Sequence, residues 1–84
     1  MAMLSRGEIL MLIRDNLAEI TGQPSLHLTE ATTADDVLDW DSINHVKLII
    51  SLEQELNMRF ESVDVEGLKD VGDLIGVIQA KMQA

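Results

Sequence analysis

Three segments of this chain repeat apolar residues at the spacing of an α-helix, and no segment shows the alternation of a β-strand. The stripes consist of Ile9, Leu12, Ile13, Leu17 and Ile20, then His45, Val46, Ile49, Leu52 and Leu56, then Val71, Leu74, Ile75, Ile78 and Met82. Such a chain buries its apolar side chains by packing helices against one another. We therefore predict an all-α fold, a small bundle of three main helices plus one short helix, with a long loop between helices one and two.

The first helix has sequence signals at both ends. Ser5 is followed three residues later by Glu8, which matches a capping box, so the helix is expected over about residues 6–20. Gly22 can adopt the left-handed cap conformation and Pro24 cannot continue a helix, so both end it.

The remaining elements follow from the same signals. Residues 21–41 have no sustained period, which predicts a long loop pinned to the core, with a short turn near residues 34–38. Helix two is expected over about residues 42–57, and residues 62–69 have room for a helix of one or two turns. Asp70 is predicted to cap the last helix.

Length and charge restrict the class of protein. Eighty-four residues support one core, so residues 1–84 are predicted to form a single domain. The formal net charge of −9 argues against a nucleic-acid partner and favours basic protein surfaces. The chain has no cysteine and no apolar run of about 18 residues. We expect a monomer in the cytoplasm that does not insert into a membrane.

Ser42 is the residue of greatest functional interest. It stands at the predicted start of helix two, where serine can simply cap the helix. Ile43 and Ile50 fall outside the predicted core face of this helix, and form a candidate docking strip beside Ser42. His45 is predicted to face the core, which leaves no base near the serine. The sequence contains no convincing catalytic or metal-ligand set, so an enzyme is the least favoured class.

Two stretches of the chain resemble the acyl carrier proteins. The first consists of Asp41, Ser42, Ile43, Val46, Leu48, Leu52, Glu53, Leu56 and Phe60, and the second of Val71, Gly72, Asp73, Leu74 and Ile78. The resemblance covers essentially the whole chain. It implies a carrier that holds acyl intermediates as thioesters on a 4'-phosphopantetheine arm and delivers them to enzymes of fatty acid, specialised lipid or polyketide biosynthesis.

The resemblance also implies the residues and partners of the site. Ser42 would carry the arm, which a phosphopantetheinyl transferase adds from coenzyme A, and Asp41 and Ile43 would present it. Further partners would be acyl-ACP synthetase, ketosynthase or acyltransferase type enzymes with basic docking surfaces. The partner-docking residues would be Asp39, Asn44, Lys47 and Ile50. The acyl cleft would be lined by Val46, Ile49, Val65, Leu68 and Ile75.

This sequence departs from the common family pattern around the serine. Ile43 replaces a leucine, Asn44 stands where aspartate is common, and Lys47 stands where glutamate is common. These differences predict dedicated partners, although a lone surface lysine can also be neutral.

Two other interpretations stay open. A peptidyl or aminoacyl carrier would share the arm, but such carriers often have Gly-Gly before the motif and this chain does not. An unmodified helical module could instead bind a partner directly through the apolar strip.

Overall fold

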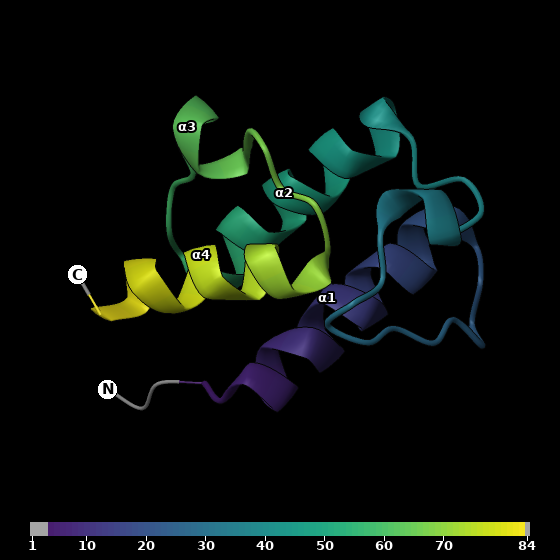
Figure 1. The fold of residues 1–84 in the computed structure, drawn as a ribbon, viewed down its shortest axis with the longest axis horizontal. Helices are drawn as coiled ribbons and strands as arrows, with labels where there is room; N and C mark the ends of the chain where they lie inside the picture. Colours follow the sequence, from purple (N-terminus) through teal and green to yellow (C-terminus); the bar gives the residue numbers. More distant parts are fainter. Residues whose placement is uncertain (1–3, 84) are drawn as a thin grey trace.

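The structure, a computed structural model, describes residues 4–83, which contain four α-helices, one short 3-10 helix and no strand. The elements in order are α1 (Arg6–Thr21), η1 (Ala34–Asp36), α2 (Ser42–Leu56), α3 (Ser62–Val65) and α4 (Val71–Gln83). The predicted all-α class and the order of three main helices and one short helix are confirmed. Figure 1 shows α4 passing in front of the lower end of α2, with α1 below both helices and α3 above α4. No helix in the described part of the chain is long and apolar enough to cross a bilayer.

Helix α1 has the predicted signals at both ends. The Ser5 side chain accepts a hydrogen bond from the Glu8 backbone N–H (3.1 Å), and the Ser5 N–H donates to the Glu8 carboxylate (2.9 Å). Gly22 has φ 69°, and its N–H closes the last turn of the helix. Because three backbone N–H groups have partners at these ends, the sequence fixes the helix boundaries to within one residue.

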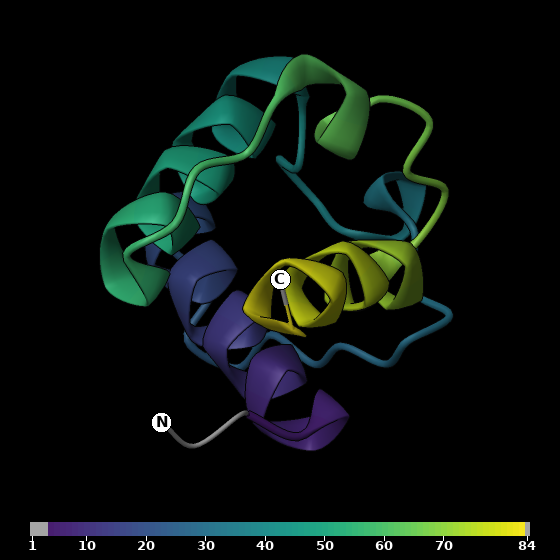
Figure 2. The same cartoon turned by 90° about the vertical axis from the view of Figure 1, so that its left-hand side faces the viewer.

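The long connection after α1 is held against the start of α4. Val71 N–H donates to the Thr32 carbonyl (2.9 Å), and Gly72 N–H donates to the Glu30 carbonyl (2.8 Å). Arg6 forms an ion pair with Glu30 (2.6 Å), and the same guanidinium donates to the Gly72 carbonyl. Figure 2 shows this loop passing below α4 and returning beside it. The loop is therefore pinned, as predicted, and contains the expected short turn as η1.

The core is aliphatic and lies where α1 packs against α2 and α4. Its fully buried side chains are Ile9, Ile13, Leu17, Leu48, Leu52, Val71, Leu74, Ile75 and Ile78. The predicted stripe of α4 is confirmed. Asp70 caps this helix by accepting the Asp73 N–H (2.9 Å). An ion pair between Lys81 and Asp64 (2.8 Å) ties α4 to α3.

The predicted core face of α2 is wrong at Val46. This side chain is 56% exposed, whereas Leu48, which was not assigned to the core face, is fully buried. The apolar residues of this helix cover an arc much wider than one contact face, so the period alone does not select which part of the arc is buried. Contact with α1 selects the side that carries Leu48 and Leu52, and this turns Val46 outward.

Candidate functional site

Ser42 is the first residue of α2, and Asp41 is the cap that precedes it. The Asp41 side chain accepts a hydrogen bond from the Asn44 backbone N–H (2.9 Å). Capping therefore belongs to Asp41 and not to the serine. The Ser42 side chain is exposed, and within residues 4–83 its hydroxyl makes no intramolecular hydrogen bond. A modifying protein can reach this oxygen from solvent.

Asn44 lies directly behind this cap and is partly buried. Its side-chain amide is turned back toward the loop and donates to the Asp39 backbone carbonyl. Asp39 itself is exposed, with φ 65°. The structure therefore gives Asn44 an intramolecular partner, and its role in docking stays a prediction.

Trp40 and His45 form one wall beside the serine. The Trp40 Nε1–H donates to His45 Nδ1 (3.1 Å), and the two rings stack with centroids 6.0 Å apart and planes 29° from parallel. Burial lowers the pKa of His45 below its ordinary value, because the imidazolium form loses hydration. The neutral ring accepts from Trp40, so Nδ1 is not placed to act as a base toward the Ser42 hydroxyl.

An open groove of about 540 Å³ begins at Ser42 and runs between α2 and the segment after α3. Its lining residues are Ala34, Trp40, Asp41, Ser42, His45, Val46, Val65, Gly67 and Leu68. A smaller recess of about 50 Å³ shares four of these residues, Ala34, Trp40, His45 and Leu68, and extends to Leu74. Its aliphatic surface comes from Ala34, Val46, Val65 and Leu68, and its polar groups come from Trp40, Asp41, Ser42 and His45.

The groove contains three of the five residues predicted for the acyl cleft, namely Val46, Val65 and Leu68. Ile49 is partly buried and packs against the core, and Ile75 is fully buried within it, so neither lines the groove. Sequence reasoning did not assign Trp40 or His45 to the groove, or Leu74 to the recess. No sequence signal marks them, because their contacts depend on how the loop and α4 meet α2.

Three aliphatic side chains are exposed along the outer side of α2. Ile43 is 69% exposed, Val46 56% and Ile50 47%, and Lys47 beside them is also exposed. The predicted exposure of Ile43 and Ile50 is confirmed, and Val46 extends the strip they form. We call Ile43, Val46 and Ile50 the α2 strip.

The carboxylates that precede Ser42 do not converge. Asp35, Asp36, Asp39 and Asp41 are all exposed, and Asp36 and Asp41 accept local backbone N–H groups. Within the part of the chain that the structure describes, no three His, Cys, Asp or Glu side chains are placed to hold a metal ion.

Comparison with known proteins gives a consistent result. Residues 12–78 match the family model described as the phosphopantetheine attachment site. The acyl carrier protein of Thermotoga maritima is 30% identical over 80 residues, which is 95% of this chain and 99% of that protein. Both matches span the groove and Ser42.

Two solved structures share the fold. The solution structure of a holo acyl carrier protein from Geobacter metallireducens superposes with a TM-score of 0.79 at 32% identity, and covers 88% of this chain and 85% of that one. An acetyl-donor carrier in complex with the HMG synthase of curacin biosynthesis also has a TM-score of 0.79, at 22% identity, covering 92% and 99%. At that identity the second structure is evidence of the fold alone.

Proposed function

Because this chain belongs to the phosphopantetheine-attachment family and is an acyl carrier protein, we propose that Ser42 is the residue that carries its covalent 4'-phosphopantetheine arm. One observation supports this choice above the others. Ser42 has an exposed hydroxyl with no hydrogen-bond partner within residues 4–83, and it stands at the mouth of the groove that Val46, Val65 and Leu68 line.

The surroundings of Ser42 suit a phosphodiester. The backbone N–H groups of Ser42 and Ile43 lie in the first turn of α2 and have no intramolecular acceptor among the described residues. Such groups and the positive end of the helix dipole stabilise a nearby anion. The Asp41 carboxylate is held on the Asn44 N–H, so it caps the helix from the side and leaves these two donors available.

The attachment reaction transfers a group from coenzyme A. The Ser42 oxygen forms a bond to the phosphorus that bears the pantetheine, the diphosphate P–O bond breaks, and adenosine 3',5'-bisphosphate leaves. The hydroxyl proton passes to a base of the transferase, because His45 Nδ1 already accepts from Trp40. When attached, the arm supplies the terminal thiol that holds an acyl group as a thioester.

The groove beside Ser42 provides apolar surface for the start of an acyl chain. Val46, Val65 and Leu68 face it, and the recess toward Leu74 continues from it. Burying apolar chain is worth about 0.8 kcal/mol per methylene group. We therefore assign the shielding of cargo to this groove.

The chain acts in this proposal as a carrier and a substrate, not as a catalyst. Residues 1–84 form a single carrier domain, and its partners are the transferase and acyl-processing enzymes. The acyl carrier with HMG synthase is an example of such a complex within this fold. Cytoplasmic location and a monomeric state complete the proposal.

The test is the addition of the arm to the purified chain. The protein is incubated with coenzyme A, magnesium and a permissive phosphopantetheinyl transferase, and then intact mass and thiol content are measured. We expect a gain of one phosphopantetheine unit and one thiol, and the thiol must come from the arm because the chain has no cysteine.

Two serine variants make the assay specific. Ser42→Ala should abolish both signals. Ser62→Ala is the matched control, because Ser62 is also exposed and is also the first residue of a helix. A chain that stays unmodified, while a control carrier is modified, would leave the unmodified interaction module as the better interpretation.

A further inference from the structure

His45 has one hydrogen-bond donor that no part of the described chain uses. Its Nδ1 accepts the Trp40 Nε1–H (3.1 Å), so the neutral ring has its proton on Nε2. Burial lowers the pKa of His45, which keeps the ring neutral near pH 7. Within residues 4–83 the Nε2–H has no acceptor, and no side-chain nitrogen or oxygen that lacks a partner is sealed from solvent there. The Nε2–H is therefore open to a bound group.

This donor belongs to the space that begins at Ser42. His45 lines both the groove and the smaller recess, so it lies where the two meet, one helical turn after Ser42. The side-chain donors of the groove lining are the Ser42 hydroxyl, the Trp40 Nε1–H and the His45 Nε2–H. The arm would occupy the first, and His45 accepts the second. The Nε2–H is therefore the side-chain donor left for a carried group in the groove.

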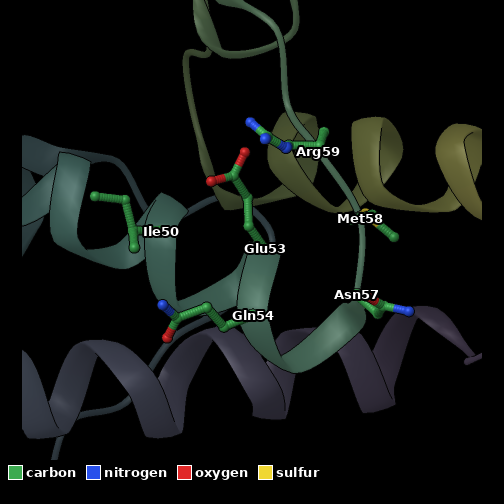
Figure 3. A pocket seen from close by; sticks show the side chains of 6 residues that line it. All are labelled: Ile50, Glu53, Gln54, Asn57, Met58 and Arg59. Atoms are coloured by element: carbon green, nitrogen blue, oxygen red, sulfur yellow. The ribbon is translucent and has the colours of Figure 1, made fainter.

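The cavity at the other end of α2 suits an acyl chain less well (Figure 3). It has a volume of about 360 Å³ and is lined by Ile50, Glu53, Gln54, Asn57, Met58 and Arg59. Four of these six side chains are polar or charged. Glu53 lies about 16 Å along the helix from Ser42, at about 1.5 Å per residue. A chain tethered at Ser42 therefore meets the groove and His45 first.

The direction in which cargo enters the groove decides which of its atoms meet His45. The thioester end of an acyl group is tied to the arm, so the chain enters with its tail first. The tail reaches the aliphatic surface of Leu68 and Leu74, and the carbons next to the thioester stay beside His45. A saturated chain would cover the Nε2–H and remove its water without offering an acceptor, which is unfavourable. An oxygen on those carbons would accept the hydrogen bond.

We propose that His45 is a specificity-determining residue for the cargo, because its Nε2–H favours a 3-oxoacyl group over the saturated acyl group of the same length. Trp40 is a positioning residue, since its N–H occupies Nδ1 and keeps the proton on Nε2. A site that donates a hydrogen bond to its ligand rejects an analogue that lacks the acceptor. The inference deepens the proposed function and rests on it, since the cargo reaches the groove from the arm on Ser42.

The test compares two cargoes that differ at one carbon. Octanoyl and 3-oxooctanoyl groups are loaded from their coenzyme A thioesters by the transferase, and intact mass verifies each product. Urea unfolding at neutral pH, followed by circular dichroism, gives the unfolding midpoint of each form. In the wild type, the midpoint of the 3-oxooctanoyl form should lie about 0.5 M urea above that of the octanoyl form, which is the shift expected from one net hydrogen bond.

Variants of two histidines separate the donor from other effects. His45→Phe keeps a flat ring but has no N–H, so the difference between the two cargoes should vanish. His45→Gln has an amide N–H and should restore part of it. His27→Phe is the matched control, because His27 is exposed and does not line the groove, and it should keep the full difference. Trp40→Phe, which frees Nδ1, should reduce the difference.

A spectroscopic measurement observes the donor itself. In the wild-type protein with nitrogen-15 in its histidine rings, the Nε2 proton of His45 should exchange with water more slowly in the 3-oxooctanoyl form than in the octanoyl form. A purely structural role of His45 would not produce this difference between cargoes. The measurement needs no variant, so it decides the question even if His45→Phe does not fold.

Three results would overturn the inference. They are equal midpoints for the two cargoes in the wild type, a difference that persists in His45→Phe, and an Nε2 proton that the arm already protects before any cargo is loaded. The last result would assign the donor to the arm. Intact mass distinguishes this failure from that of the proposed function. If cargo is loaded on Ser42 but the midpoints are equal, only the cargo preference is wrong. If Ser42 is never modified while a control carrier is, both proposals fail.

Discussion

The side-chain amide of Asn44 donates a 2.7 Å hydrogen bond to the backbone carbonyl of Asp39, the loop residue that has φ 65°. A positive φ is uncommon for a residue with a side chain, so this turn needs support from its surroundings. The same asparagine gives its backbone N–H to the Asp41 carboxylate. These two bonds fix the loop on both sides of Trp40 and so determine where Ser42 begins α2.

Asn44→Ala tests this arrangement. We expect a loss of about 1 kcal/mol or less in the free energy of unfolding, because the hydrogen bond to the Asp39 carbonyl disappears. Amide exchange should become faster at Asp39, Trp40 and Asp41. Urea unfolding and hydrogen exchange measure the two effects. Gln54→Ala, at an exposed residue of the same helix, is the control, and equal exchange in both variants would contradict the proposed role of Asn44.

The pH dependence of stability should contain a contribution from His45. Its pKa in the folded protein is lowered by burial from an ordinary value of 6.5, so the unfolded chain takes up the proton first. This contribution is fully present above pH 6.5 and is lost as the pH falls through the lower folded value. Protonation at Nδ1 also removes the acceptor of the Trp40 N–H.

Trp40 is the single tryptophan, so its fluorescence during acidification from pH 7.5 to 5 reports directly on the protonation of His45. His45→Gln should remove both the spectral change and the stability change in that range, while His27→Gln should keep them. If the free energy of unfolding instead rises on acidification over this range, the predicted loss of stability on protonation of His45 is wrong.

A separate loss of stability is expected near pH 4 and below. The hydrogen bond from Arg6 lowers the pKa of Glu30, and the hydrogen bond from Lys81 lowers the pKa of Asp64. Because these carboxyl pKa values are lower in the folded protein than in the unfolded chain, the two carboxylates stabilise the folded state above about pH 4. Their protonation at lower pH removes this stabilisation. Asp64→Asn should reduce the slope of unfolding free energy against pH in this range, whereas Asp15→Asn, a change at an exposed aspartate of α1, serves as the comparison.

Two glycines of α4 should respond to alanine in opposite directions. A Cβ at Gly72 would lie 3.0 Å from the Glu30 carbonyl oxygen, so the loop would have to move and Gly72→Ala should cost about 1–3 kcal/mol. A Cβ at Gly76 meets nothing within 4 Å, so Gly76→Ala should stabilise the helix by up to about 1 kcal/mol. Urea unfolding of both variants measures this difference, and equal effects would show that the loop does not constrain Gly72.

Two valines of α3 test the groove. Loading an octanoyl group onto the arm should raise the melting temperature of the protein if the groove shields the chain. Val65→Ser, in the groove, should reduce this rise, while Val63→Ser, which is exposed outside it, should not. Unmodified forms of both variants provide the baseline for each melting temperature. An equal rise in both would place the acyl chain elsewhere.

The local signals in the sequence determined where most helices begin and end. Ser5 with Glu8, Gly22 and Asp70 acted as predicted, because each satisfies backbone groups within a few residues of itself. The stripe of α4 was equally clear, because its apolar residues lie on one side. Ser42 was also visible as the start of α2.

Only the tertiary structure decided which side of α2 is buried and what surrounds Ser42. The apolar arc of α2 is wider than one contact face, so contact with α1 selected Leu48 over Val46. The Asn44–Asp39 and Trp40–His45 hydrogen bonds, and the Arg6–Glu30 pair, depend on how the loop folds back onto the helices. A local sequence pattern predicts how nearby residues satisfy backbone hydrogen bonds. Contacts between segments that are distant in the sequence form only when the whole chain folds around one core.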